Sequence, residues 1–353
     1  MSFDTIDLLT GKVFQVTWDT GRRCNYDCTY CPAHRHDNFS KHATLEELKN
    51  NVDFLFEYTD LYMTHRKFKE ANFGFTGGEP TVNPNFIKFA EYLSTRKQEI
   101  EELNLHLDLT TNGAMSKTIA DNVIKHFDYV TVSYHAESDD RLKKQVIDRI
   151  QQFHKSNIGL KVNVMLHAQH FDECVAVCDT LKNLGVNFIP RSIDRDSLNT
   201  QAHLYTQDQI DWFEKYWHKD VSNKGRPCCG GRTFGVCTSA GVEPSKYVES
   251  REFKGWHCSV NWYFLHIEQQ TKLIYTHQTC QARLDGTKGA IGNLDAAKDL
   301  IQRLRHQLST NSMPITVCPN KICGCGLCTP KHVHRDTLKE SLKDVLIDIN
   351  VLV

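Results

Sequence analysis

Three cysteines near the N-terminus have the spacing of a metal-binding loop. Cys24, Cys28 and Cys31 lie within the segment RRCNYDCTYCPAH, and no fourth cysteine is close to them. Thiolates are the usual ligands of [4Fe–4S] clusters, and four cysteines are the usual complement. Three cysteines on one cubane would leave one iron open to another ligand, as catalytic metal sites keep one position free. On spacing alone, a zinc ion completed by His34 or His36 is an alternative.

The segments around these cysteines alternate between strand and helix patterns. The expected strands are 13–19, 71–77, 103–110, 128–134, 159–166 and 186–190. The expected helices are 44–60, 84–101, 115–127, 137–156 and 171–184. Such alternation predicts right-handed β–α–β units and a parallel sheet, either open and doubly wound or closed wholly or partly into a barrel. In both arrangements active residues gather where strands end, and the cysteine loop follows the first expected strand.

Composition and charge exclude several classes of function. The 42 Lys and Arg residues nearly balance 43 Asp and Glu, for a formal net charge of -1, so neither a nucleic acid nor a membrane is expected as a partner. The N-terminal segment lacks the pattern of a secretory signal, and no apolar run reaches the roughly 20 residues of a membrane span. The chain is therefore expected to be cytoplasmic. In that reducing compartment, 14 cysteines indicate metal or redox chemistry more than disulfides.

The cysteine loop resembles a known family signature. Cys24-x3-Cys28-x2-Cys31, with Tyr30 before the last cysteine and the loop following a first strand, resembles the signature of the radical S-adenosylmethionine enzymes. In that family the open iron is chelated by the amino and carboxylate groups of S-adenosylmethionine. The resemblance covers about residues 13–190, and it identifies the six expected strand–helix units as a partial (β/α)6 TIM-like barrel.

The resemblance also implies contacts to S-adenosylmethionine. The sequence Gly77-Gly78-Glu79-Pro80, after the second expected strand, matches the motif that binds the methionine amino group, with Glu79 accepting from the ammonium. The remaining implied contacts to the carboxylate, ribose and adenine involve Ser133, Asn163 and Pro190.

His135 follows Ser133 at the same strand end and could exchange a proton with the substrate, which makes it the candidate catalytic residue. A structural role is the alternative for this histidine.

A second group of cysteines lies in the C-terminal part of the chain. The candidate ligands are Cys258, Cys280, Cys318, Cys323, Cys325 and Cys328. The order of features in this region resembles the auxiliary-cluster extensions called SPASM and twitch domains. Two cysteines lie around a hairpin at 257–280, and a Gly-Asn-Leu segment and then a dense run of cysteines follow. The final run departs from the full SPASM spacing, and Cys₄ zinc is an alternative for it. Whether Cys228, Cys229 or Cys237 also binds a cluster stays open, whereas Cys174 and Cys178 fit packing residues.

These patterns divide the chain into four expected parts. Residues 1–215 form the barrel, 216–257 a bridge, 258–330 a smaller cysteine-rich auxiliary-cluster domain, and 331–353 a C-terminal helical tail. The resemblance implies three kinds of cofactor: a [4Fe–4S] cluster with one open iron, S-adenosylmethionine, and one or two auxiliary [4Fe–4S] clusters. It also implies an external one-electron reductant of the flavodoxin or ferredoxin type.

The expected function is hydrogen abstraction by a 5′-deoxyadenosyl radical. Peptide or protein side chains are the expected substrates, in oxidative modification or cross-linking. Only about 12 residues precede the first expected strand, so a leader-peptide-binding protein would be a separate partner. The alternative is a dehydrogenase or rearrangement enzyme acting on a small molecule such as a sugar, nucleotide or amino acid. A non-enzymatic electron carrier is disfavoured, because it would not need the Gly-Gly-Glu-Pro motif.

Overall fold

The computed structural model describes most of the expected barrel and parts of the C-terminal region. The described residues are 5–6, 13–32, 34–64, 68, 70–100, 103–193, 205–220, 253–283, 286–310, 315–321 and 331–341. Cys228, Cys229, Cys237, Cys323, Cys325 and Cys328 lie outside these ranges.

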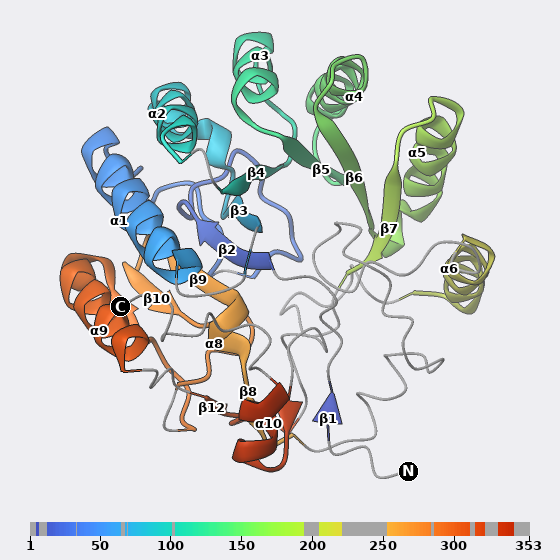
Figure 1. Cartoon of the computed structure of the whole chain (residues 1–353). Helices are drawn as coiled ribbons and strands as arrows, with labels where there is room; N and C mark the ends of the chain where they lie inside the picture. The colour runs from blue at the N-terminus through green and yellow to red at the C-terminus, as the bar shows by residue number, and fades with distance from the viewer. Residues whose placement is uncertain are drawn as a thin grey trace.

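Six consecutive parallel strands form the centre of the fold. They are β2 (Val13–Asp19), β3 (Glu70–Thr76), β4 (Asn104–Thr111), β5 (Tyr129–His135), β6 (Gly159–Leu166) and β7 (Phe188–Ser192). The helices that follow them are α1 (Leu45–Thr64), α2 (Phe86–Gln98), α3 (Lys117–His126), α4 (Asp140–His154), α5 (Phe171–Asn183) and α6 (Gln207–Asp220). Figure 1 shows these helices in an arc outside the strands. The prediction of an α/β fold with a partial (β/α)6 barrel is confirmed.

Alternating burial explains why these segments form strands with one face toward the helices. In β4, Leu105, Leu107 and Leu109 are almost fully buried, while the residues between them are partly exposed. Successive strand side chains point to opposite faces, so the leucines pack against helices and the intervening polar residues face the barrel interior. The same alternation in neighbouring strands builds one continuous core.

Helix starts follow local capping signals. Thr44 and Glu47 form a capping box before α1: Thr44 Oγ1 accepts from Glu47 N, and Glu47 Oε2 accepts from Thr44 N. Ser116 and Asp139 cap α3 and α4 through their side-chain oxygens.

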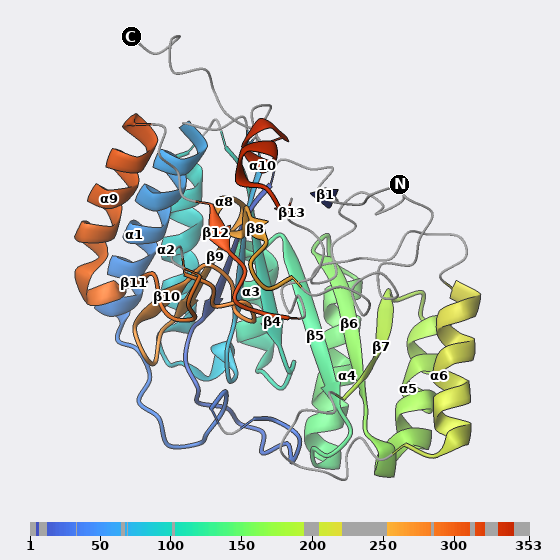
Figure 2. The ribbon, with the colours of Figure 1, turned by 90° about the horizontal axis from the view of Figure 1, so that it is seen from below.

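A segment from the C-terminal region extends the main sheet. The expected hairpin is present as β9 (Phe264–Glu268) and β10 (Leu273–Tyr275), and β11 (Gly292–Asn293) pairs with β10. Strand β9 also pairs in parallel with β2, so the sheet has nine strands in the order β11-β10-β9-β2-β3-β4-β5-β6-β7. Helix α9 (Ala297–Ser309) lies beside α1 (Figures 1 and 2), and Arg305 contacts Glu57 across this interface at 2.8 Å.

A second, smaller sheet carries one of the C-terminal cysteines. Its order is β1 (Thr5–Ile6), β13 (Lys331–His332), β8 (His257–Cys258) and β12 (Thr316–Val317). The short helices α8 (Val260–Tyr263) and α10 (Arg335–Ser341) also belong to this part of the chain. The boundaries at 215, 257 and 330 remain predictions.

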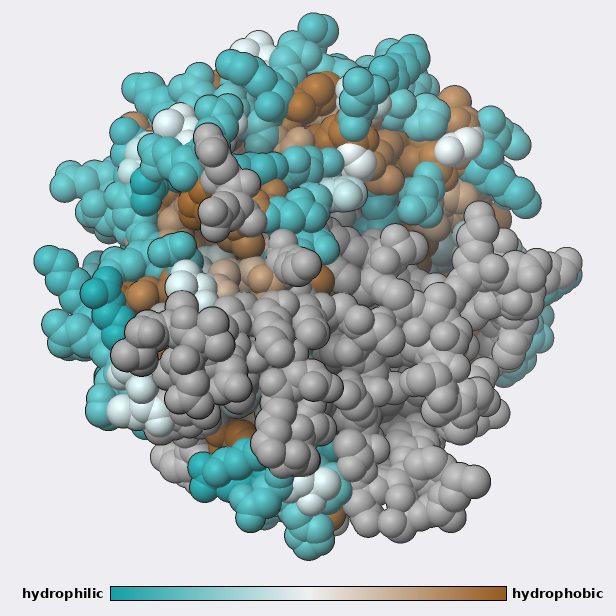
Figure 3. Space-filling view, viewed as in Figure 1, coloured by the Kyte–Doolittle hydropathy of each residue, from teal (hydrophilic) through white to brown (hydrophobic). Residues whose placement is uncertain are grey.

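Hydrophilic side chains cover much of the described surface on the face in Figure 3, with hydrophobic side chains visible between them. Among the described helices, none is long and apolar enough to cross a membrane.

Candidate active site

A pocket of about 210 Å³ lies at the C-terminal ends of the barrel strands and contains the cysteine triplet. Nine of the residues singled out in the sequence line it: Cys24, Cys28, Tyr30, Cys31, His36, Gly77, Gly78, Ser133 and His135. They come from the loop after β2, the loop after β3, and the end of β5. The fold therefore brings the two most specific sequence motifs to one pocket.

The three cysteines are held in a partly apolar environment. Tyr26, Cys28, Tyr30 and Ile193 form a small buried cluster against which Cys24 and Cys31 pack. Burial raises the pKa of the Cys24 thiol to about 11 and that of Cys28 to about 12. A bound cation would compensate these buried sulfurs for the loss of solvent, since metal binding to cysteine displaces the thiol proton.

Backbone hydrogen bonds dock the two motif loops on each other. Gly78 N donates to Gly21 O at 2.8 Å, and Glu79 N donates to Arg23 O at 2.9 Å. A Cβ on Gly78 would lie 2.2 Å from the Arg22 carbonyl oxygen, and one on Gly77 would lie 2.5 Å from the Gly21 carbonyl oxygen. Glycine is required because these backbones approach too closely for a side chain. The position of the cysteine loop thus depends on the glycine pair.

The side chain of Glu79 lies outside the pocket lining. It is 2% exposed, and its oxygens accept from Thr81 N, Thr81 Oγ1, Thr111 Oγ1 and Asn112 N at 2.5–3.1 Å. Burial raises its pKa, while these hydrogen bonds oppose that shift. In the described geometry Glu79 fixes the ends of β3 and β4, and Gly77 and Gly78 line the pocket. The expected contact of Glu79 with the ammonium group remains a prediction. Pro80 is buried at the start of the turn 80–82.

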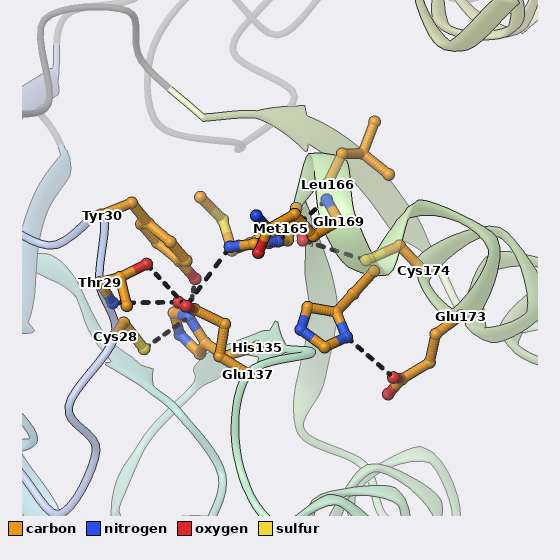
Figure 4. A network of polar contacts seen from close by, with 12 residues as sticks. Cys28, Thr29, Tyr30, His135, Glu137, Met165, Leu166, Gln169, Glu173 and Cys174 are labelled. Atoms are coloured by element: carbon orange, nitrogen blue, oxygen red, sulfur yellow. Dashed lines mark hydrogen bonds and ion pairs between the residues drawn. The ribbon is translucent and has the colours of Figure 1, made fainter. Parts of the chain in front are cut away.

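His135 contacts the cysteine loop directly (Figure 4). Its Nδ1 atom lies against the Tyr30 hydroxyl and 3.6 Å from Cys28 Sγ, and its ring stacks on that of Tyr30. Burial lowers the pKa of His135 to about 4, so the ring is neutral near pH 7. A neutral ring in these contacts can position the loop, whether or not it also exchanges a proton with substrate.

Glu137 adds a second connection between the cysteine loop and the strand ends, which Figure 4 also shows. Its carboxylate accepts from Thr29 N at 3.1 Å and from Thr29 Oγ1 at 2.6 Å. Its Oε1 atom lies 3.3 Å from Nε2 of the buried His167, whose Nδ1 accepts from Gln169 N. These contacts tie the loop to the ends of β5 and β6.

The residues expected around the adenosine are distributed over three strands. Ser133 and Asn163 are paired neighbours on β5 and β6, so their side chains share the interior face. Asn163 Oδ1 is buried and has no hydrogen-bond partner among the residues that the structure describes, so it is free to accept from a ligand. Pro190 is buried and pairs with Val164, a core residue. Both residues lie on the face of the sheet opposite to Ser133 and Asn163. The Pro190 ring therefore faces the helices, and the expected contact of this part of β7 with an adenine remains a prediction.

The described C-terminal cysteines are close in the structure. Cys258, Cys280 and Cys318 are 3–5% exposed, and no disulfide joins them to one another or to another described cysteine. Cys258 pairs with Thr316 across β8 and β12, and Cys318 N donates to Trp256 O. Asn320 contacts both Cys280 and Cys318. Its Nδ2 donates to Cys280 O at 3.4 Å, and its carbonyl oxygen lies 3.6 Å from Cys318 Sγ.

Several pocket residues were not singled out from the sequence. They are Asp19, Tyr26, Arg35, Thr76, Thr110, Thr111, Asn112 and Gln278. Asp19 and Asn112 follow the rule that polar residues cluster at strand ends, which could have identified them. Gln278 comes from the segment after β10, and no local signal places that segment over the barrel.

One family model matches much of the chain. Residues 18–189 match the model described as Radical SAM superfamily. This range begins within β2 and ends within β7, so it includes the cysteine loop and the glycine pair.

The chain is similar to a curated protein and to several solved structures. The S-adenosylmethionine-dependent nucleotide dehydratase of Pseudoalteromonas ulvae is 24% identical over 224 residues, 56% of this chain and 67% of the relative. Native anSMEcpe with bound AdoMet has a TM-score of 0.52 at 14% identity, covering 84% of this chain and 83% of that one. SuiB of Streptococcus suis bound to S-adenosylmethionine has a TM-score of 0.51 at 14% identity, covering 82% and 64%. At these identities the structures show a shared fold.

Proposed function

Because this chain contains a radical SAM superfamily domain, we propose that it is an enzyme that reductively cleaves S-adenosylmethionine and abstracts a hydrogen atom from a substrate. The observation that carries this proposal is the single pocket that unites the cysteine triplet with Gly77 and Gly78. When bound, the cluster and S-adenosylmethionine would supply an electron and a 5′-deoxyadenosyl radical.

The residues of the pocket fit these groups. Cys24, Cys28 and Cys31 would bind three irons, and buried sulfurs with raised pKa values favour a compensating cation. Gly77 and Gly78 let the backbone approach a ligand closely, so their carbonyls are candidates for accepting from its ammonium group. Ser133 and Asn163 remain our candidates for its carboxylate and ribose.

Other residues would act by positioning. Tyr30 and His135 hold the cysteine loop in place, and Glu79 fixes the strand ends behind the glycine pair. We keep a proton-transfer role for His135 as a proposal. The backbone near Pro190 is the candidate surface for the adenine.

Anaerobic turnover would test this function. The reconstituted protein, incubated with S-adenosylmethionine and dithionite, should release 5′-deoxyadenosine, measured by liquid chromatography and mass spectrometry. The Cys24→Ala/Cys28→Ala/Cys31→Ala variant is the matched control and should release none. Absence of 5′-deoxyadenosine from wild-type protein with an intact cluster would contradict the proposal.

We further propose that the C-terminal cysteines bind one or two auxiliary clusters in a SPASM- or twitch-like arrangement. The proximity of buried Cys258, Cys280 and Cys318 supports it, and Cys323, Cys325 and Cys328 remain candidate ligands. Iron and sulfide would be counted in the variant lacking Cys24, Cys28 and Cys31. About four irons would indicate one auxiliary [4Fe–4S] cluster and about eight would indicate two. An iron-free variant, or one holding zinc, would contradict it.

The proposed substrate is a peptide or protein side chain, with an external one-electron reductant and a separate leader-binding protein as partners. The proposed auxiliary region supports it, since related extensions occur in many peptide-modifying enzymes. A small-molecule substrate is the second candidate, and the match to a nucleotide dehydratase favours it. Formation of 5′-deoxyadenosine would be compared with nucleoside triphosphates and with candidate peptides. The class that raises the rate and is itself changed in mass is the substrate class.

A further inference from the structure

A histidine and two carboxylates meet where β2 and β9 end side by side. Asp19 and Glu268 are register partners on these parallel strands, and His266 lies two residues before Glu268. Paired residues and residues two apart share one face of a sheet, so the three side chains lie together. Their candidate ligand atoms all lie within 4.8 Å of one another.

The hydrogen bond of His266 fixes which ring nitrogen faces the carboxylates. Its Nδ1 atom lies 3.2 Å from the Thr17 carbonyl oxygen, which can only accept, so Nδ1 carries the hydrogen. In the neutral ring Nε2 then has a lone pair, and it lies 3.8 Å from Asp19 Oδ2 and 3.7 Å from Glu268 Oε1. Both distances are too long for hydrogen bonds. Three potential electron-pair donors therefore converge at one place.

Burial makes this arrangement unfavourable without a ligand. The His266 side chain is 1% exposed, and neither its Nε2 nor Asp19 Oδ1 has a hydrogen-bond partner within the described part of the chain. Burial lowers the pKa of His266 and raises that of Asp19, although Arg35 near Asp19 opposes the second shift. Buried polar groups normally have partners, so these orphaned atoms indicate that something binds between them.

Surrounding contacts hold the ligand atoms in place. Gln269 N donates to the Asp19 carbonyl at 2.9 Å, which locks the two strand ends together. Thr271 Oγ1 donates to Glu268 Oε2 at 2.9 Å and so leaves Oε1 directed toward His266. Such outer contacts orient ligands in metal sites.

We propose that Asp19, His266 and Glu268 bind one divalent cation at the wall between two pockets. Carboxylate oxygens suit Mn²⁺ and Mg²⁺, whereas an imidazole nitrogen suits Zn²⁺, so these three ions are the candidates and Mn²⁺ serves as the probe. Asp19 lines the cysteine pocket, and Asp19 and Glu268 both line a second pocket beside it. With three protein ligands, the cation keeps coordination positions open toward these pockets, where an anionic oxygen of a small ligand could bind.

Manganese binding to the anaerobic, cluster-loaded protein tests this site. Free Mn²⁺ would be counted by its electron paramagnetic resonance signal during a titration of wild type, Asp19→Asn and Glu268→Gln. We expect one bound Mn²⁺ per wild-type chain, and affinity lower by about 10-fold or more in each variant. The measurement needs neither S-adenosylmethionine nor turnover, so its result is independent of the proposed cleavage reaction.

The matched control is Asp295→Asn. Asp295 is an exposed carboxylate near the same hairpin that pairs with Lys272 at 2.8 Å, and its variant should bind Mn²⁺ as wild type does. Thermal unfolding measured with and without Mn²⁺ separates folding from binding, since a bound ion raises the midpoint of any folded variant that retains the site. Absence of stoichiometric binding in wild type would overturn the proposal. So would wild-type affinity in both Asp19→Asn and Glu268→Gln.

Discussion

Two polar residues of the pocket region show opposite states of hydrogen bonding. Glu79 receives four hydrogen bonds within the protein, whereas Asn163 Oδ1 is buried with none. A satisfied group contributes mainly to folding, and an unsatisfied one costs stability unless a ligand uses it. Substitution at these two positions should therefore separate folding from cofactor binding.

At Asn163, alanine should weaken binding of S-adenosylmethionine without destabilising the protein. One lost hydrogen bond corresponds to about 0.5–1.5 kcal/mol, or up to roughly 10-fold in the dissociation constant. Anaerobic calorimetry would measure the affinity, and chemical denaturation would measure the free energy of unfolding. Asn122→Ala is the matched control, because Asn122 is partly exposed on α3 and its side chain donates to Thr118 O within the same helix. Unchanged affinity in Asn163→Ala would contradict a ribose contact.

At Glu79, glutamine should destabilise the protein. Thr81 N donates to one carboxylate oxygen and Asn112 N to the other, so the amide nitrogen of glutamine would face a second donor. We expect a loss of about 1–3 kcal/mol in the free energy of unfolding, measured by denaturation. The exposed substitution Glu99→Gln serves as control. A Glu79→Gln variant as stable as wild type, yet impaired in binding, would instead favour direct contact with the ammonium.

At the scale of elements, the close approach of two loops determines the geometry of the pocket. Gly78→Ala would bring a Cβ against the carbonyl oxygens of Arg22 and Arg23, both of which are backbone atoms that cannot rotate away. The cysteine loop should shift, and the variant should retain less iron than wild type after reconstitution. Gly74→Ala, on β3, meets its nearest atom at an ordinary 3.6 Å and should retain wild-type iron. Equal iron in both variants would contradict this docking.

The parts of the fold predicted from sequence are those with local signals. The alternation of strand and helix patterns along the sequence predicted the six barrel strands to within two residues at each end, and the spacing of the cysteine triplet identified that motif. The pairing of β9 with β2 joins segments about 250 positions apart, and no local pattern encodes such a partner. For that reason the cluster of Asp19, His266 and Glu268, and the position of Gln278, were not predicted.

At the scale of the whole molecule, the C-terminal region completes the barrel sheet. Strand β9 covers the edge of β2, α9 packs on α1, and Tyr62 Oη donates to the Asn261 carbonyl at 2.7 Å. Asn51 of α1 donates to Gln269 at 2.8 Å in a buried contact just after β9. These contacts couple the stability of residues 13–220 to that of residues 253–310.

Separating the two regions should therefore expose an apolar strand edge. In a fragment of residues 1–220, β2 would keep β3 but lose β9 from its other edge, although Val16 and Trp18 in β2 are 2% and 0% exposed in the full chain. Unpaired edges of apolar strands promote aggregation. We expect the fragment to be insoluble or to unfold without cooperativity, measured by circular dichroism and sedimentation. Coexpression of residues 251–353 should restore solubility, whereas a soluble, cooperatively folded fragment that binds iron would show that the barrel is an independent domain.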